Sequence, residues 1–102
     1  MAVEVRALIW DEQNEEHIAK HGVTPREVNQ MVENPHIFVR NRRHRRGQLL
    51  MIGSTHGGRV LTVALAKAKS KDAWRPTTAY GATDAQKRLL EQQLGGSAKE
   101  RP

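Results

Sequence analysis

The spacing of hydrophobic positions changes along this chain, and each spacing predicts a different secondary structure. Apolar residues recur every three or four positions after Asp11 and again after Thr83, as on one face of a helix. They form short, β-branched or aliphatic runs, typical of strands, over residues 3–10, 36–40, 48–54, 59–65 and 74–80. The predicted order is β-α-α-β-β-β-β-α. We therefore expect an α+β fold, in which two N-terminal helices and one C-terminal helix pack on one face of a mostly antiparallel sheet.

Capping residues mark where the helices begin. Asp11 can cap the first helix, and Gly22 suits its left-handed stop. Thr24 followed by Pro25 and Glu27 is a capping box with proline at the first helical position. A second such box opens the C-terminal helix. These signals predict two short consecutive helices between the first strand and the next.

Proline and glycine set the limits of the last strand and of the domain. Pro76 has no N–H for the sheet, so it either places this strand at an edge or forces a bulge. Gly95-Gly96 should stop the last helix. We expect one domain over residues 1–94 and a frayed tail over 95–102.

Composition excludes several classes of protein. The 102-residue chain has no cysteine, which rules out disulfides and a cysteine zinc site. No long apolar segment indicates a signal peptide or a membrane helix, so we expect a cytoplasmic protein. His17 and His21 have a spacing suited to metal, but no third ligand is near them in the sequence. We expect neither a metal site nor a cofactor.

Charge is divided unevenly along the chain. Residues 1–39 carry three Lys/Arg against seven Asp/Glu, whereas residues 40–102 carry fourteen against four, and the whole chain is +6. Five arginines and one histidine fall within residues 40–46, which the strand pattern places in a surface turn. Clustered positive charge favours a nucleic-acid partner over an ordinary solvated surface.

Several segments together resemble BrnT-like toxins, the toxin half of a type II toxin–antitoxin system. Residues 9–14 (Ile-Trp-Asp-Glu-Gln-Asn) and 18–23 (Ile-Ala-Lys-His-Gly-Val) are similar to the family's WDxxK/N…KHGV opening. Residues 75–83 (Arg-Pro-Thr-Thr-Ala-Tyr-Gly-Ala-Thr) are similar to its R-I-I-S-A-R-x-A-T segment. The resemblance covers about residues 8–92. Two positions depart from the pattern: Tyr80 stands where the family usually has arginine, and Gln48 falls within its G-E-x-R segment.

The resemblance implies a compact RelE-like fold and a metal-independent endoribonuclease. It also implies a cognate antitoxin that silences the toxin and supplies the DNA-binding module with which the complex binds operator DNA. The alternative is a toxin-fold protein that binds nucleic acid or a protein partner without cleaving RNA. The departures at Tyr80 and Gln48 are what would separate these readings.

Metal-free RNA cleavage needs a base for the 2′-hydroxyl, an acid for the 5′-oxygen and cations for the charge on phosphorus. Arg75 and Lys20 suit the cationic role. His21 belongs to the family-like segment and could carry the proton, although its residue type equally suits a helix C-terminus. Tyr80 could replace the missing arginine as a hydrogen-bond donor, or face the core. We expect Arg75, Lys20 and Tyr80 to share a shallow basic groove, flanked by the third meander strand and the C-terminal helix.

The nucleic-acid contacts are expected to come mainly from the arginine-rich turn. Phosphate recognition by guanidinium groups does not depend on a fixed base sequence. Trp10 could stack on a base, or be a core residue at the end of a strand. The candidate RNA-binding residues are Arg40, Arg42, Arg43, His44, Arg45, Arg46, Arg59 and Trp10.

Overall fold

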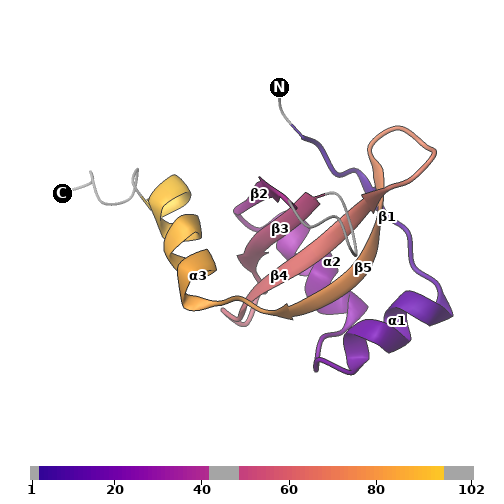
Figure 1. The fold of residues 1–102 in the computed structure, drawn as a ribbon, viewed down its shortest axis with the longest axis horizontal. Helices are drawn as coiled ribbons and strands as arrows, with labels where there is room; N and C mark the ends of the chain where they lie inside the picture. Colours follow the sequence, from indigo (N-terminus) through magenta and orange to yellow (C-terminus); the bar gives the residue numbers. More distant parts are fainter. Residues whose placement is uncertain (1–2, 42–48, 96–102) are drawn as a thin grey trace.

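The computed structural model, which describes residues 3–41 and 49–95, has a five-stranded sheet in the order β1-β5-β4-β3-β2 (Figure 1). The predicted α+β class and element order are confirmed. The elements are β1 (Ala7–Leu8), α1 (Glu12–Ala19), α2 (Pro25–Glu33), β2 (His36–Arg40), β3 (Leu49–Ser54), β4 (Val60–Lys67), β5 (Ala73–Gly81), α3 (Asp84–Leu90) and a π-helical turn η1 (Glu91–Gly95).

Strands β2 to β5 form an antiparallel meander, and β1 pairs with β5 in the parallel direction. The predicted first strand over residues 3–10 is mostly extended chain, and only Ala7–Leu8 is a strand. The last backbone hydrogen bond of this pairing runs from the N–H of Ile9 to Trp74 O, at 2.9 Å. The chain then turns into the N-cap of α1.

Pro76 lies at a bulge in β5, one of the two outcomes expected for it. It also lies on an edge, because β1 pairs with β5 only at Ala73 and Trp74, and among the described strands none runs beside Pro76 on that side. On β4, the neighbours Ala64 and Leu65 pair with Thr78 and Pro76, so Thr77 is the extra residue. The Thr77 hydroxyl donates to Ala64 O at 3.3 Å. A side chain thus fills part of the gap that the bulge opens in the ladder.

All three helices begin with a capping box. The boxes of α2 (Thr24 with Glu27) and α3 (Thr83 with Gln86) are those that the sequence predicts. In α1 the reciprocal partner of Asp11 is Asn14. Gly22, with φ of +73°, ends the turn after α1 in the left-handed conformation expected of it.

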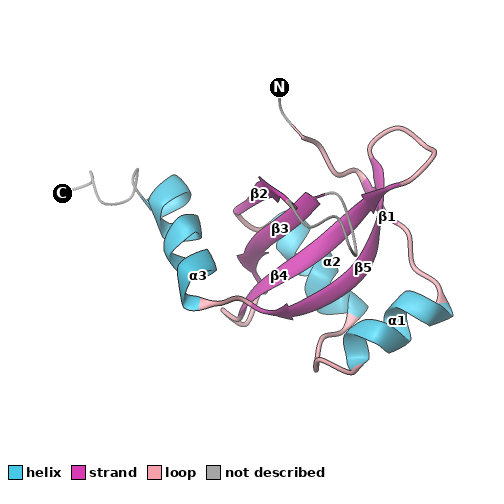
Figure 2. Ribbon diagram, viewed as in Figure 1, coloured by secondary structure: helices cyan, strands magenta, loops and turns pink. Residues whose placement is uncertain are grey.

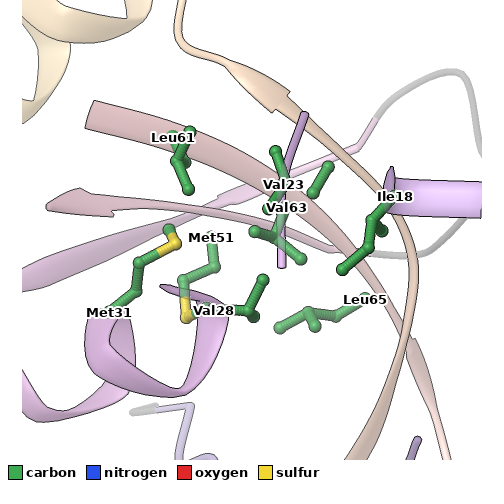
Figure 3. Packing of buried hydrophobic residues seen from close by; sticks show 9 residues of the cluster. Ile18, Val23, Val28, Met31, Met51, Leu61, Val63 and Leu65 are labelled. Atoms are coloured by element: carbon green, nitrogen blue, oxygen red, sulfur yellow. The ribbon is translucent and has the colours of Figure 1, made fainter. Parts of the chain in front are cut away.

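The larger core lies between α1, α2 and one face of the sheet (Figure 3). Ile18 from α1 and Met31 from α2 are fully buried against Met51 of β3, Val63 and Leu65. In Figure 3 the labelled side chains of helix and strands point into one shared space. This packing fixes the position of both N-terminal helices on the sheet.

A second, smaller core lies on the opposite face, under α3. Met51 belongs to the first cluster and its neighbour Ile52 to the second, and successive strand residues face opposite sides. Leu90 of α3 packs with Ile37 and Ile52. Figure 2 shows α3 apart from α1 and α2, beyond the far end of the sheet. The expectation that all helices share one face therefore holds for α1 and α2 only.

No helix in residues 3–41 or 49–95 is long and apolar enough to cross a membrane.

Gly53 allows β2 and β3 to approach closely, because a Cβ at this position would lie 2.8 Å from His36 Cβ. We predict that Gly53→Ala lowers the free energy of unfolding by about 1–3 kcal/mol through overpacking. Gly81→Ala is the matched control, since an added Cβ there meets no atom within 4 Å. Urea unfolding of both variants checks the prediction, and equal stabilities would contradict it.

Candidate active site

A groove of about 470 Å³ runs between α1 and β5, and polar side chains line it. Each wall includes residues from the segments that carry the sequence resemblance. The α1 wall contributes five residues and the β5 wall two: Gln13, Asn14, Glu16, His17 and Lys20 from α1, with Arg75 and Thr77 from β5. Arg75 and Lys20, which the sequence assigns to one cationic site, therefore do line the same groove.

Asn14 joins the two walls at the base of the groove. It is 2% exposed, and every polar group of its side chain is bonded. Its Nδ2 donates to Ile9 O at 3.0 Å and to Pro76 O at 2.9 Å, while its Oδ1 accepts from the backbone N–H of Asp11 at 2.9 Å. One side-chain amide thus caps the N-terminus of α1 and bonds to a backbone carbonyl on the edge of β5 that β1 does not cover.

Asp11 and Arg75 form an ion pair at the mouth of the groove. Arg75 Nη2 donates to Asp11 Oδ2 at 2.6 Å, and Asp11 Oδ1 accepts from the backbone N–H of Asn14 at 2.9 Å. The Asn14 N–H and the positive charge of Arg75 lower the pKa of the Asp11 carboxyl below its ordinary value. Asp11 is therefore ionised across the physiological range.

The α1 wall combines groups of different charge type. Lys20 follows the last residue of α1 and is exposed, whereas His17 is half-buried. Glu16 adds an exposed carboxylate. Two cations, an imidazole and a carboxylate in one groove are the groups that phosphodiester cleavage needs: charge stabilisation together with proton transfer.

His21 follows Lys20 directly but does not line the groove. Its ring packs edge-on against His17 with the centroids 5.8 Å apart. Among the described residues, no three His, Cys, Asp or Glu side chains gather as a metal site would require.

Tyr80 does not join Arg75 and Lys20, so this part of the predicted groove is wrong. It lies five residues further along β5, about 16 Å at the usual strand rise. There it pairs with Thr62, and its hydroxyl accepts from Gln86 Nε2 of α3 at 3.2 Å. The flanking elements also differ from the prediction, because α1 and not α3 forms the opposite wall of the groove.

The side chains of Trp10 and Arg59 contact other residues of the protein. Trp10 packs against the larger core and its Nε1 donates to Asn29 Oδ1 at 3.3 Å, which favours the core reading. Arg59 Nη1 donates to Glu27 Oε2 at 3.0 Å and to Gly22 O at 2.9 Å. It thereby ties the β4 start to the turn between α1 and α2.

Arg40 is exposed at the end of β2, which is the outer strand of the sheet. Of the five arginines within residues 40–46, it is the one that the structure describes. The predicted RNA contacts Arg42, Arg43, His44, Arg45 and Arg46 lie outside the described residues.

Sequence reasoning missed Asn14 as the central residue of this region. The ion pair of Arg75 with Asp11 was not predicted either. One signal was available: an asparagine three positions after an N-cap aspartate can complete a capping box. Nothing in the local sequence could show that the same amide also reaches Pro76.

No protein-family model and no curated protein matches this chain.

Asn14→Ala tests whether one amide holds the two walls together. It removes the partners of two carbonyls and of one N–H, so we predict a loss of about 2–3 kcal/mol in the free energy of unfolding. Gln13→Ala, at the exposed preceding position, should leave stability nearly unchanged. Urea unfolding of the two variants decides this, and a stable Asn14→Ala protein would refute the structural role.

The lowered pKa of Asp11 predicts a dependence of stability on pH. A carboxyl whose pKa is lower when folded stabilises the protein above its unfolded pKa, and this contribution is lost as the pH falls through the folded value. Wild type should therefore be more stable than Asp11→Asn at about pH 7, and the difference should shrink as the pH falls below the ordinary aspartate pKa of about 3.9. A difference that is the same at both pH values would contradict the assignment.

Proposed function

We propose that this protein is the toxin of a type II toxin–antitoxin system, a metal-independent endoribonuclease that cleaves RNA in the groove between α1 and β5. The observation that carries the proposal is the convergence of Arg75 and Lys20 with His17 and Glu16 in one polar groove. Lys20 and Arg75 come from segments that resemble BrnT-like toxins, and His17 and Glu16 lie between two such segments.

The proposed reaction is attack of a ribose 2′-oxygen on the adjacent phosphorus, with departure of the 5′-oxygen. A base takes the 2′-hydroxyl proton, and an acid returns a proton to the leaving oxygen. Arg75 and Lys20 stabilise the negative charge that develops on the phosphate oxygens. His17 and Glu16 line the groove and are the candidates for proton transfer, while His21 contacts the ring of His17.

The charge distribution supports RNA as the substrate class. The net charge of +6 and the cluster of arginines at residues 40–46 would attract a polyanion. In this proposal a cognate antitoxin neutralises the toxin, and the complex binds operator DNA through the antitoxin. The location would be the cytoplasm, where the RNA is.

A second candidate is a non-catalytic protein of the same fold that binds nucleic acid or a protein partner. It is favoured by the ion pair itself, because Arg75 is already bonded to Asp11 and could serve only to join β5 to α1. Tyr80 also favours this candidate. It stands where the resembled family usually has an arginine, and its hydroxyl bonds to Gln86 of α3 instead of contacting the groove.

Cleavage of a labelled single-stranded RNA, with a chelator present, tests the proposal. We predict that wild type cleaves, and that Arg75→Ala lowers the rate by about a hundredfold or more because charge stabilisation is lost. Lys20→Gln should also lower it, by less, since Lys20 is exposed.

Arg26→Gln is the matched control, because it removes one positive charge from an exposed position of α2 that does not line the groove. Circular dichroism and urea unfolding confirm that each variant is folded. A folded Arg75→Ala protein with the wild-type rate would remove Arg75 from the active site. A wild type that cleaves no RNA would favour the non-catalytic candidate.

A further inference from the structure

Asp11 has a place beside the groove that the proposed reaction does not yet use. The carboxylate of Asp11 is held in place independently of Arg75. Its Oδ1 accepts from the backbone N–H of Asn14, and the backbone N–H of Asp11 donates to Asn14 Oδ1, both at 2.9 Å. Only Oδ2 remains to accept from Arg75, at 2.6 Å. The direction of this oxygen is therefore set by the start of α1.

The ion pair leaves most of the Arg75 fork available. Among hydrogen bonds to described residues, the guanidinium makes one, from Nη2. The side chain of Arg75 is 31% exposed and lines the groove. A guanidinium presents several N–H donors in a rigid plane, so fixing one nitrogen fixes the direction of the others.

We propose that Asp11 is a positioning residue that orients the Arg75 guanidinium toward a phosphodiester in the groove. This inference rests on the proposed ribonuclease function. It assigns to Asp11 no contact with the substrate, only an effect exerted through Arg75.

Two physical effects of Asp11 have opposite signs, which makes the inference testable. Its negative charge near the groove opposes the binding of an anionic substrate, so removing it should strengthen binding. If Asp11 also orients Arg75, the same removal should slow the chemical step. A lower kcat with an unchanged or lower KM separates orientation from simple repulsion.

Asp11→Asn is the first variant to test. Asparagine is as good an N-cap as aspartate, so the start of α1 is kept. In wild type Asn14 and Arg75 donate to different carboxylate oxygens. If the carbonyl oxygen of asparagine keeps the bond from Asn14, the amide N–H₂ takes the place that faces Arg75, and this group cannot accept. Asp11→Ser, another good cap without a carboxylate, provides a second variant if the first folds poorly.

The experiment compares kcat and KM for cleavage of a defined RNA by wild type, Asp11→Asn, Asp11→Ser and Glu12→Gln. Glu12 is the matched control, because it is the adjacent exposed carboxylate of α1 and does not line the groove. We predict that both Asp11 variants lose about tenfold to a hundredfold in kcat with KM unchanged or lower. Glu12→Gln should keep the wild-type kcat.

Coupling to Arg75 is the decisive part of the test. Combined with Arg75→Ala, the Asp11→Asn change should cause no further loss of kcat, because the group that it orients is gone. A further loss of the same size would overturn the inference, as would wild-type kcat in Asp11→Asn. If wild type cleaves no RNA, the proposed function fails and the role of Asp11 fails with it. If wild type cleaves and only these predictions fail, the proposed function stands.

Discussion

The buried amide of Asn14 is the interaction on which the rest of the site depends. It satisfies the end of β1, the free edge of β5 and the N-terminus of α1 with one side chain. A buried group with this many bonds is stable only if all of them form together. For this reason the position of α1 against β5, and with it the width of the groove, follows from local hydrogen bonding as well as from the packing of Ile18.

Irregularity in β5 creates the site. A continuous strand pairing would extend β1 along β5 and leave no room for side chains between α1 and the sheet. Pro76 has no N–H to offer, the carbonyl of Pro76 bonds to Asn14, and Thr77 bulges from the β4 ladder. Arg75 and Thr77 are thereby presented on either side of a proline whose backbone angle is fixed. The cationic and polar groups stand on elements that the larger core holds rigid.

The fold could be predicted from the sequence far better than the site. Strand runs, the two predicted capping boxes at Thr24 and Thr83, and the Gly22 stop are local signals, and the structure follows them closely. The shortness of β1, the face covered by α3 and the distance from Arg75 to Tyr80 depend on tertiary register, which no local pattern encodes. Pairing Arg75 with Asp11 required knowing that residues 64 positions apart in sequence meet at one edge of the sheet. Arg59 is likewise a residue type that suits phosphate binding, yet its guanidinium bonds to Glu27 and to the carbonyl of Gly22.

Solution NMR can test directly whether nucleic acid binds in the α1–β5 groove, as we propose. A short single-stranded DNA oligonucleotide has the same phosphodiester groups as RNA but lacks the 2′-hydroxyl that attacks, so it should bind without being cleaved. The expected result of the titration is that the amide signals of residues 13–20, and those of Arg75 and Thr77, shift, with weaker changes over α3. Shifts confined to α3 and the Tyr80 end of β5, with the groove signals unmoved, would contradict it.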